Sequence, residues 1–249
     1  MPLSDDVNNS KPGSLLFYNK RLYVSIHSPL MSPDKGFIAY SEDSGKTFRY
    51  NLNTPWTKVK NSNFICRMFI NMGKGYNLNS DGYVYAFGMG SEVDWGGSVY
   101  LGRVKKDAIM TYSAWEYFSG MNKANNPKWL KNQDGAAAVP GLTAKHLISS
   151  IYHPGLKSYI AMSAETINGK IFTAPNPWGP WTLAGKWFDD TNSEWVSSYM
   201  PGIIPKGAGA NSFYFAIAGA AQPAKIGGQM TETRYCFRLG EITLELVQK

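Results

Sequence analysis

The chain has 249 residues, of which 43% are hydrophobic, 14% aromatic and only 17% charged. This length suits one domain with a sizeable core, and the many Gly, Pro, Tyr and Trp residues favour strands and tight turns over long exposed helices. The net charge of +7 comes from scattered Lys and Arg with no run longer than Lys105-Lys106, which disfavours a nucleic-acid-binding stripe.

One unit recurs along the chain: an apolar strand, a turn, a strand with alternating aromatic residues, and a hairpin. The units cover about residues 12–60, 61–122, 140–188 and 195–248. In chain order, strands are expected at 15–18, 21–26, 36–40, 47–50, 64–70, 82–88, 98–104, 114–118, 146–152, 158–162, 169–174, 181–183, 198–204, 212–217, 234–239 and 242–246. Each run alternates or is continuously apolar at strand length.

This recurrence predicts an all-β fold, a β-propeller built of four-stranded antiparallel blades, within a single domain spanning residues 1–249. A β-sandwich is the structural alternative, but it would not need the unit to recur in the same order. No run of about 18 apolar residues occurs, and residues 1–6 lack the basic and apolar regions of a signal peptide. Neither a membrane span nor export is therefore visible in the sequence.

Residues 41–48 fit the pattern S-x-D-x-G-x-T-aromatic at every fixed position. In such a hairpin Asp43 can accept hydrogen bonds from backbone N–H groups, Gly45 takes a positive φ, and Phe48 points back between the sheets. The pattern resembles the Asp-box of sialidases and related propellers, whose role there is structural. Asp43 is therefore not expected to act as a general acid, and residues 176–182 read as a degenerate copy of the same hairpin.

Five segments carry a wider resemblance: 82–88, 100–104, 114–118, 177–182 and 199–206. They resemble five-bladed propellers of the sialidase and arabinanase type of glycoside hydrolase, and within these a family catalogued as a domain of unknown function that includes endo-D-arabinanases. The resemblance implies a secreted or cell-surface protein that handles an extracellular polysaccharide or oligosaccharide. Neighbouring propeller families include lyases of uronate polysaccharides.

The chain departs from that family at its start. Such propellers carry a carboxylate on the innermost strand of the first blade, whereas only four units are visible here and the chain opens almost directly on a strand. Either the first blade is missing from this sequence, or four blades close the propeller, or the catalytic equipment is lost. No catalytic carboxylate of the family is carried over to this chain.

Innermost strands line the axial channel of a propeller, and no Asp or Glu occurs on those expected here. A glycosidase usually needs two carboxyl groups about 5 to 10 Å apart, so they would have to come from loops. The candidate loop acids are Glu92, Asp94, Glu165, Asp189, Asp190 and Glu194.

The inner strands instead offer Arg67, His146 and Tyr199, with Ser149 nearby. This set suits β-elimination on a uronate, because an Arg can neutralise the carboxylate while a His or Tyr moves the proton. The structural alternatives are hydrogen-bonded packing for the histidine and a bridge between blades for the arginine. Trp95 lies between two strands of the second unit and could stack on a sugar ring.

Three functions follow from these residues. The first is a glycoside hydrolase-like protein that acts on or binds a polysaccharide in the axial pocket, around Arg67, His146, Tyr199 and the Trp95 loop. The second is a non-catalytic glycan-binding or scaffold propeller, and the third is a uronate lyase. Trp56 and Trp187 are further candidates for stacking on sugar.

No cofactor is predicted. The two cysteines, Cys66 and Cys236, and the three histidines show no metal-ligand spacing, although a cation held in the channel by one or two side chains stays an open alternative. Both cysteines are expected to be buried thiols, and they could form a disulfide only if their strands meet.

Overall fold

The computed structural model of the chain describes residues 10–90, 97–145, 147–165, 168–188, 195–204, 209–221, 225–226, 229–230 and 235–245. Apart from 3-10 turns, its regular elements are β-strands, as the alternating apolar pattern predicts. The turns are η2 (Lys58–Lys60), η3 (Lys74–Tyr76), η5 (Tyr112–Ala114) and η6 (Gln133–Gly135). Within the described residues, no helix has the length and hydropathy needed to cross a bilayer.

The first sheet is an antiparallel meander of consecutive strands. Its order is β1 (Lys11–Tyr18), β2 (Arg21–Ser28), β3 (Lys35–Ser41) and β4 (Arg49–Tyr50). Asn19 and Lys20 join β1 to β2, and both have positive φ, of 48° and 63°. Positive φ at both central residues gives the twist that a two-residue hairpin loop requires.

The central sheet contains ten strands, made of two meanders joined at their inner edges. The second meander comprises β5 (Cys66–Asn71), β6 (Tyr83–Met89), β7 (Gly97–Lys105), β8 (Glu116–Met121), β9 (Pro127–Leu130) and β10 (Ala138–Ala144), which pairs with β7. The third meander comprises β11 (Ile148–His153), β12 (Ser158–Glu165), β13 (Asn168–Ala174) and β14 (Thr182–Phe188). The two join through a short parallel pairing of β5 with β11, at Ile70–Ser150 and Asn71–Ile151.

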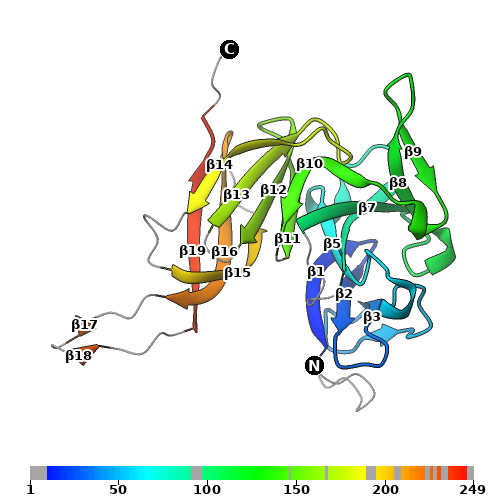
Figure 1. Cartoon of the computed structure of the whole chain (residues 1–249), viewed down its shortest axis with the longest axis horizontal. Coiled ribbons are helices and arrows are strands. Elements are labelled where there is room, and N and C mark those ends of the chain that lie inside the picture. Colours follow the sequence, from blue (N-terminus) through cyan, green and yellow to red (C-terminus); the bar gives the residue numbers. More distant parts are fainter. Residues whose placement is uncertain are drawn as a thin grey trace.

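The fourth repeated unit forms a sheet of its own, the fourth sheet, from β15 (Trp195–Ile204), β16 (Ser212–Ala221) and β19 (Tyr235–Thr243). A separate two-stranded pair joins β17 (Lys225–Ile226) to β18 (Gln229–Met230). In Figure 1 the strands β8 and β9 lie on the right of the molecule and β15, β16 and β19 on the left, with β11 and β12 between them. Contacts of β1 with β5, of β5 with β11 and of β11 with β15 bring the inner strands together.

Some details differ from the strands expected from sequence. The sequence predicts no strand between 119 and 145, but β9 and β10 lie there, and their prolines at positions 127 and 140 weaken the strand pattern. It also predicts separate strands at 234–239 and 242–246, but a single strand, β19, runs from 235 to 243. A Cβ atom on Gly240 would lie 2.5 Å from the ring of Phe215, so this glycine accommodates a ring and does not mark a turn.

Burial explains why the sheets stay together. The largest buried cluster surrounds the second meander and includes Trp56, Trp115 and Phe64, each at most 1% exposed. A second cluster, which includes Ile160 and Phe213, lies between the third meander and the fourth sheet. Fully burying a large apolar side chain stabilises a fold by about 1.5–3 kcal/mol. Cys66 in β5 is buried, as expected for this residue.

The hairpin at residues 41–48 has the hydrogen bonds that its sequence pattern predicts. Asp43 Oδ2 accepts from the Thr47 hydroxyl at 2.6 Å and Oδ1 from the Thr47 backbone N–H at 2.9 Å, while the Ser41 hydroxyl donates to Oδ1 at 2.7 Å. These bonds hold the pKa of Asp43 well below its usual range. Gly45 has a φ of 86°, a conformation that favours glycine. Asp43 and Gly45 therefore both stabilise the turn.

Candidate functional site

A pocket of about 400 Å³ lies where the inner strands of the sheets converge. Residues from β1, β5 and β15 line it, together with residues 147–149 at the start of β11. Gly13 allows the close approach of β1 to β5, because a Cβ atom there would lie 2.9 Å from Ser25 Oγ and 3.1 Å from the Arg67 carbonyl oxygen. This axial pocket is therefore a consequence of how closely the inner strands pack.

Hydroxyl groups hold the walls of the axial pocket together. Ser14 Oγ of β1 accepts a hydrogen bond from the Phe69 N–H of β5 at 2.8 Å. Ser149 Oγ of β11 accepts one from the Ile203 N–H of β15 at 3.0 Å. Because these bonds satisfy backbone donors between neighbouring strands, the two serines fix the shape of the pocket.

Asn71 is the remaining polar side chain in the described lining of the axial pocket. It is partly buried at the end of β5, and within the described residues its side-chain amide has no hydrogen-bond partner. A primary amide offers two donors and an acceptor. The described lining contains no Asp, Glu, His, Lys or Arg, so it offers hydrogen bonds but no acid–base pair.

Arg67 lies on β5 but serves the contact between the first sheet and the second meander. Its side chain is 1% exposed, and Nη1 donates to the Phe64 carbonyl at 2.5 Å while Nη2 donates to the Phe37 carbonyl at 2.6 Å. The guanidinium lies 3.9 Å from the centre of the Trp56 ring, and burial lowers the pKa of Arg67 to about 10. Arg67 thus bridges two blades, which is the structural alternative to ligand binding given above for this arginine.

Other predicted residues have different positions. Ser149 lines the axial pocket, and Tyr199 lies in β15, where it pairs with Ala218. Trp56 is fully buried and its Nε1 donates to the Tyr117 hydroxyl at 2.7 Å, so the expectation that it stacks on sugar is wrong. Glu165 ends β12, opposite Asn168. Outside the described residues lie Glu92, Asp94, Trp95, His146, Asp189, Asp190 and Glu194.

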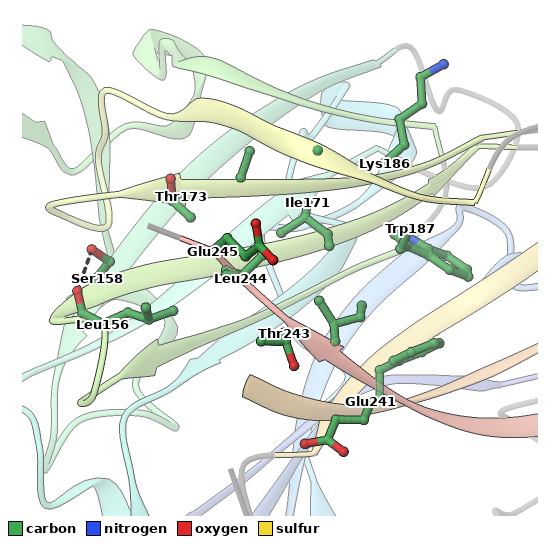
Figure 2. Close-up of a pocket in the computed structure, with 14 residues that line it drawn as sticks. Leu156, Ser158, Ile171, Thr173, Lys186, Trp187, Glu241, Thr243, Leu244 and Glu245 are labelled. Atoms are coloured by element: carbon green, nitrogen blue, oxygen red, sulfur yellow. Dashed lines mark hydrogen bonds between the residues drawn. The ribbon is translucent and has the colours of Figure 1, made fainter. Parts of the chain in front are cut away.

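A larger pocket of about 890 Å³ lies between the third meander and β19 (Figure 2). Trp187 of β14 lines it, as do Glu241 and Glu245 at the end of β19 and just beyond it. Neither glutamate is predicted as a site residue from the sequence. The alternation of Glu241, Thr243 and Glu245 is typical of the solvent-exposed face of an outer strand. Their position opposite a tryptophan depends on how two sheets pack, which no local pattern reveals.

The described residues give no sign of a metal centre. Across these parts of the chain, no group of three His, Cys, Asp or Glu side chains is placed to hold a metal ion.

Residues 12–221 match the family described as Domain of unknown function (DUF4185). The chain belongs to this family. No curated protein matches the chain.

Solved structures similar to the chain include glycoside hydrolases. One is CoXyl43, a GH43 β-xylosidase/α-arabinofuranosidase from a compost microbial metagenome, with a TM-score of 0.56 and 13% identity over 93% of this chain and 69% of that chain. Another is the GH43_1 enzyme from Xanthomonas citri, with a TM-score of 0.53 and 11% identity over 88% and 71% of the two chains. The GH43 endo-arabinanase from Bacillus licheniformis has a TM-score of 0.51 and 15% identity over 96% and 78%.

These similarities establish the fold. The DUF4185 chain has the all-β propeller fold that its repeated units predicted, which is the architecture of these GH43 enzymes. At these identities the shared property is the architecture, because a propeller can keep its blades while its site residues change.

Proposed function

We propose that this DUF4185 propeller binds a glycan in its axial pocket without cleaving it. The observation that carries the proposal is the chemistry of that pocket, whose described lining combines hydroxyl and amide groups with apolar side chains and contains no ionisable side chain. A ligand with many hydroxyl groups and no charge matches such a lining. The similar structures add support, since CoXyl43 was solved with xylotriose and the Xanthomonas citri enzyme with xylose.

Asn71 is the residue best placed to recognise the sugar. The side-chain NH2 of Asn71 can donate to one sugar hydroxyl and its C=O can accept from another, because neither group has a partner within the described residues. Leu15 and Phe69 supply apolar surface beside it. A volume of about 400 Å³ is near the lower end of the range for ligand pockets, roughly 300–1,000 Å³, so the pocket suits a short stretch of glycan.

Binding without cleavage agrees with the described lining better than either enzymatic alternative. Hydrolysis needs two carboxyl groups, and these would have to come from residues such as Glu92, Asp94 or Glu194, or from Glu165. The lyase hypothesis needs a cation to neutralise a uronate carboxylate. Arg67 already donates to two backbone carbonyls and is 1% exposed, which argues against that role.

The test is calorimetric titration of the protein with xylotriose and with a panel of arabino-, xylo- and uronate oligosaccharides. Asn71→Leu keeps the side-chain size and removes the amide, so we expect about tenfold weaker binding, or about 1.4 kcal/mol. Lys128→Ala, an exposed change in β9, is the control and should bind as the wild type does.

Mass spectrometry of the same mixtures decides between binding and catalysis. Intact ligand with measurable affinity supports the proposal. Saturated fragments would establish a hydrolase, and unsaturated uronates a lyase, and either product would overturn the proposal. An absence of binding across the whole panel would overturn it as well.

A further inference from the structure

The larger pocket in Figure 2 contains an aromatic platform that is already held in place. Trp187 Nε1 donates to the Ser163 carbonyl of β12 at 3.1 Å, and its ring centre lies 5.4 Å from that of Phe215 of β16 at an angle of 55°. Gly240 leaves the space that the Phe215 ring occupies. Because the tryptophan is fixed before any ligand arrives, binding on it costs little additional side-chain entropy.

Polar groups surround this platform from two elements. Glu241, Thr243 and Glu245 alternate along one side of β19 and its continuation, and both glutamates are exposed. Lys186 of β14 also lines the pocket, and in Figure 2 its ammonium group points away from the glutamates. In the part of the chain that is described, neither carboxylate forms an ion pair or a hydrogen bond, which leaves their oxygens available.

The floor between these groups is apolar and includes Ile171 and Leu156. A sugar ring has C–H faces that stack on aromatic and aliphatic surface, and hydroxyl edges that reach carboxylates and ammonium groups. The two glutamates outnumber the single lysine in the lining, so an anionic sugar such as a uronate is disfavoured. A neutral glycan is the common carbohydrate class that suits this lining.

We propose that this pocket is a second carbohydrate-binding site, for a neutral oligosaccharide stacked on Trp187. The inference rests on the proposed function, because it assumes that the propeller binds glycan. The proposed role is binding and not hydrolysis, because both glutamates are exposed to solvent, whereas glycosidase acids work in sites that exclude water.

The test is the stoichiometry of binding, measured by calorimetry with neutral xylo- and arabino-oligosaccharides. We expect wild-type protein to bind two ligands per chain. Trp187→Leu removes the platform and should weaken one of the two binding steps about tenfold while leaving the other unchanged. Because Trp187 also packs on Phe215, the variant Glu245→Ala provides a second measurement at an exposed position that does not endanger folding.

The variants separate this inference from the proposed function. If Asn71→Leu abolishes all binding while the Trp187 and Glu245 variants bind as wild type, the second site is refuted and the axial site stands. If the Trp187 and Glu245 variants lose all binding while Asn71→Leu loses none, the axial proposal is wrong and the pocket of Figure 2 is the binding site. Lys128→Ala again serves as the control.

Discussion

Replacing Arg67 with methionine removes a buried cation that joins the first sheet to the second meander. The variant Arg67→Met keeps a side chain of similar length but leaves the carbonyls of Phe64 and Phe37 without their donors. Each unsatisfied buried carbonyl costs about 1–3 kcal/mol. The stacking of a desolvated guanidinium on Trp56, 3.9 Å from the ring centre, is lost as well and is worth about 2 kcal/mol.

One term opposes these losses. Burying an unneutralised charge costs several kcal/mol, and that cost disappears in the variant. The same cost is the reason why burial lowers the pKa of Arg67 to about 10. Taking these terms together, we expect Arg67→Met to lower the free energy of unfolding by about 3 kcal/mol.

Chemical denaturation followed by circular dichroism and tryptophan fluorescence measures this change. The matched control is Arg103→Met, because Arg103 also stacks on a tryptophan, Trp129, at 4.0 Å but is 18% exposed and pairs with Glu116 at 2.9 Å. We expect a loss of about 1 kcal/mol there. If Arg67→Met keeps wild-type stability and loses glycan binding, Arg67 is a ligand-binding residue and the reasoning from its burial is wrong.

Three further changes test other parts of the structure. Among the described residues, the buried Ser163 Oγ has no hydrogen-bond partner, so Ser163→Ala should raise the free energy of unfolding by about 1 kcal/mol, and a loss of stability in denaturation would contradict this. Gly36→Ala would place a Cβ atom 2.0 Å from the Ile65 carbonyl oxygen, so we expect a loss of about 3 kcal/mol or failure to fold; wild-type melting would refute the packing argument. Burial raises the pKa of Tyr117 to about 12, so the stability that Tyr117 contributes in full below about pH 10 should be lost as pH rises to about 12. The measurement is the melting temperature as a function of pH between about 9 and 12, where the tyrosine is already ionised in the unfolded state but still protonated in the folded state. In Tyr117→Phe the fall of the melting temperature with pH should be smaller.

Local sequence determined the strands and one turn of this protein. Side chains alternate between the two faces of a strand, so each run of alternating apolar residues marks a strand before any partner is known. The hairpin around Asp43 and Gly45 was equally predictable, because its hydrogen bonds and its positive φ involve residues at most four positions apart.

Only the tertiary structure decided what the side chains on those strands do. Arg67 and Asn71 lie on the same strand, two alternations apart, yet Arg67 is enclosed by Phe37 and Trp56 of the first 60 residues while Asn71 lines the axial pocket. That Trp187, Glu241 and Glu245 line one pocket likewise depends on the packing of the third meander against β19. Burial and the identity of a partner are set by contacts between residues far apart in sequence, so a periodic pattern predicts the strand but not its neighbours.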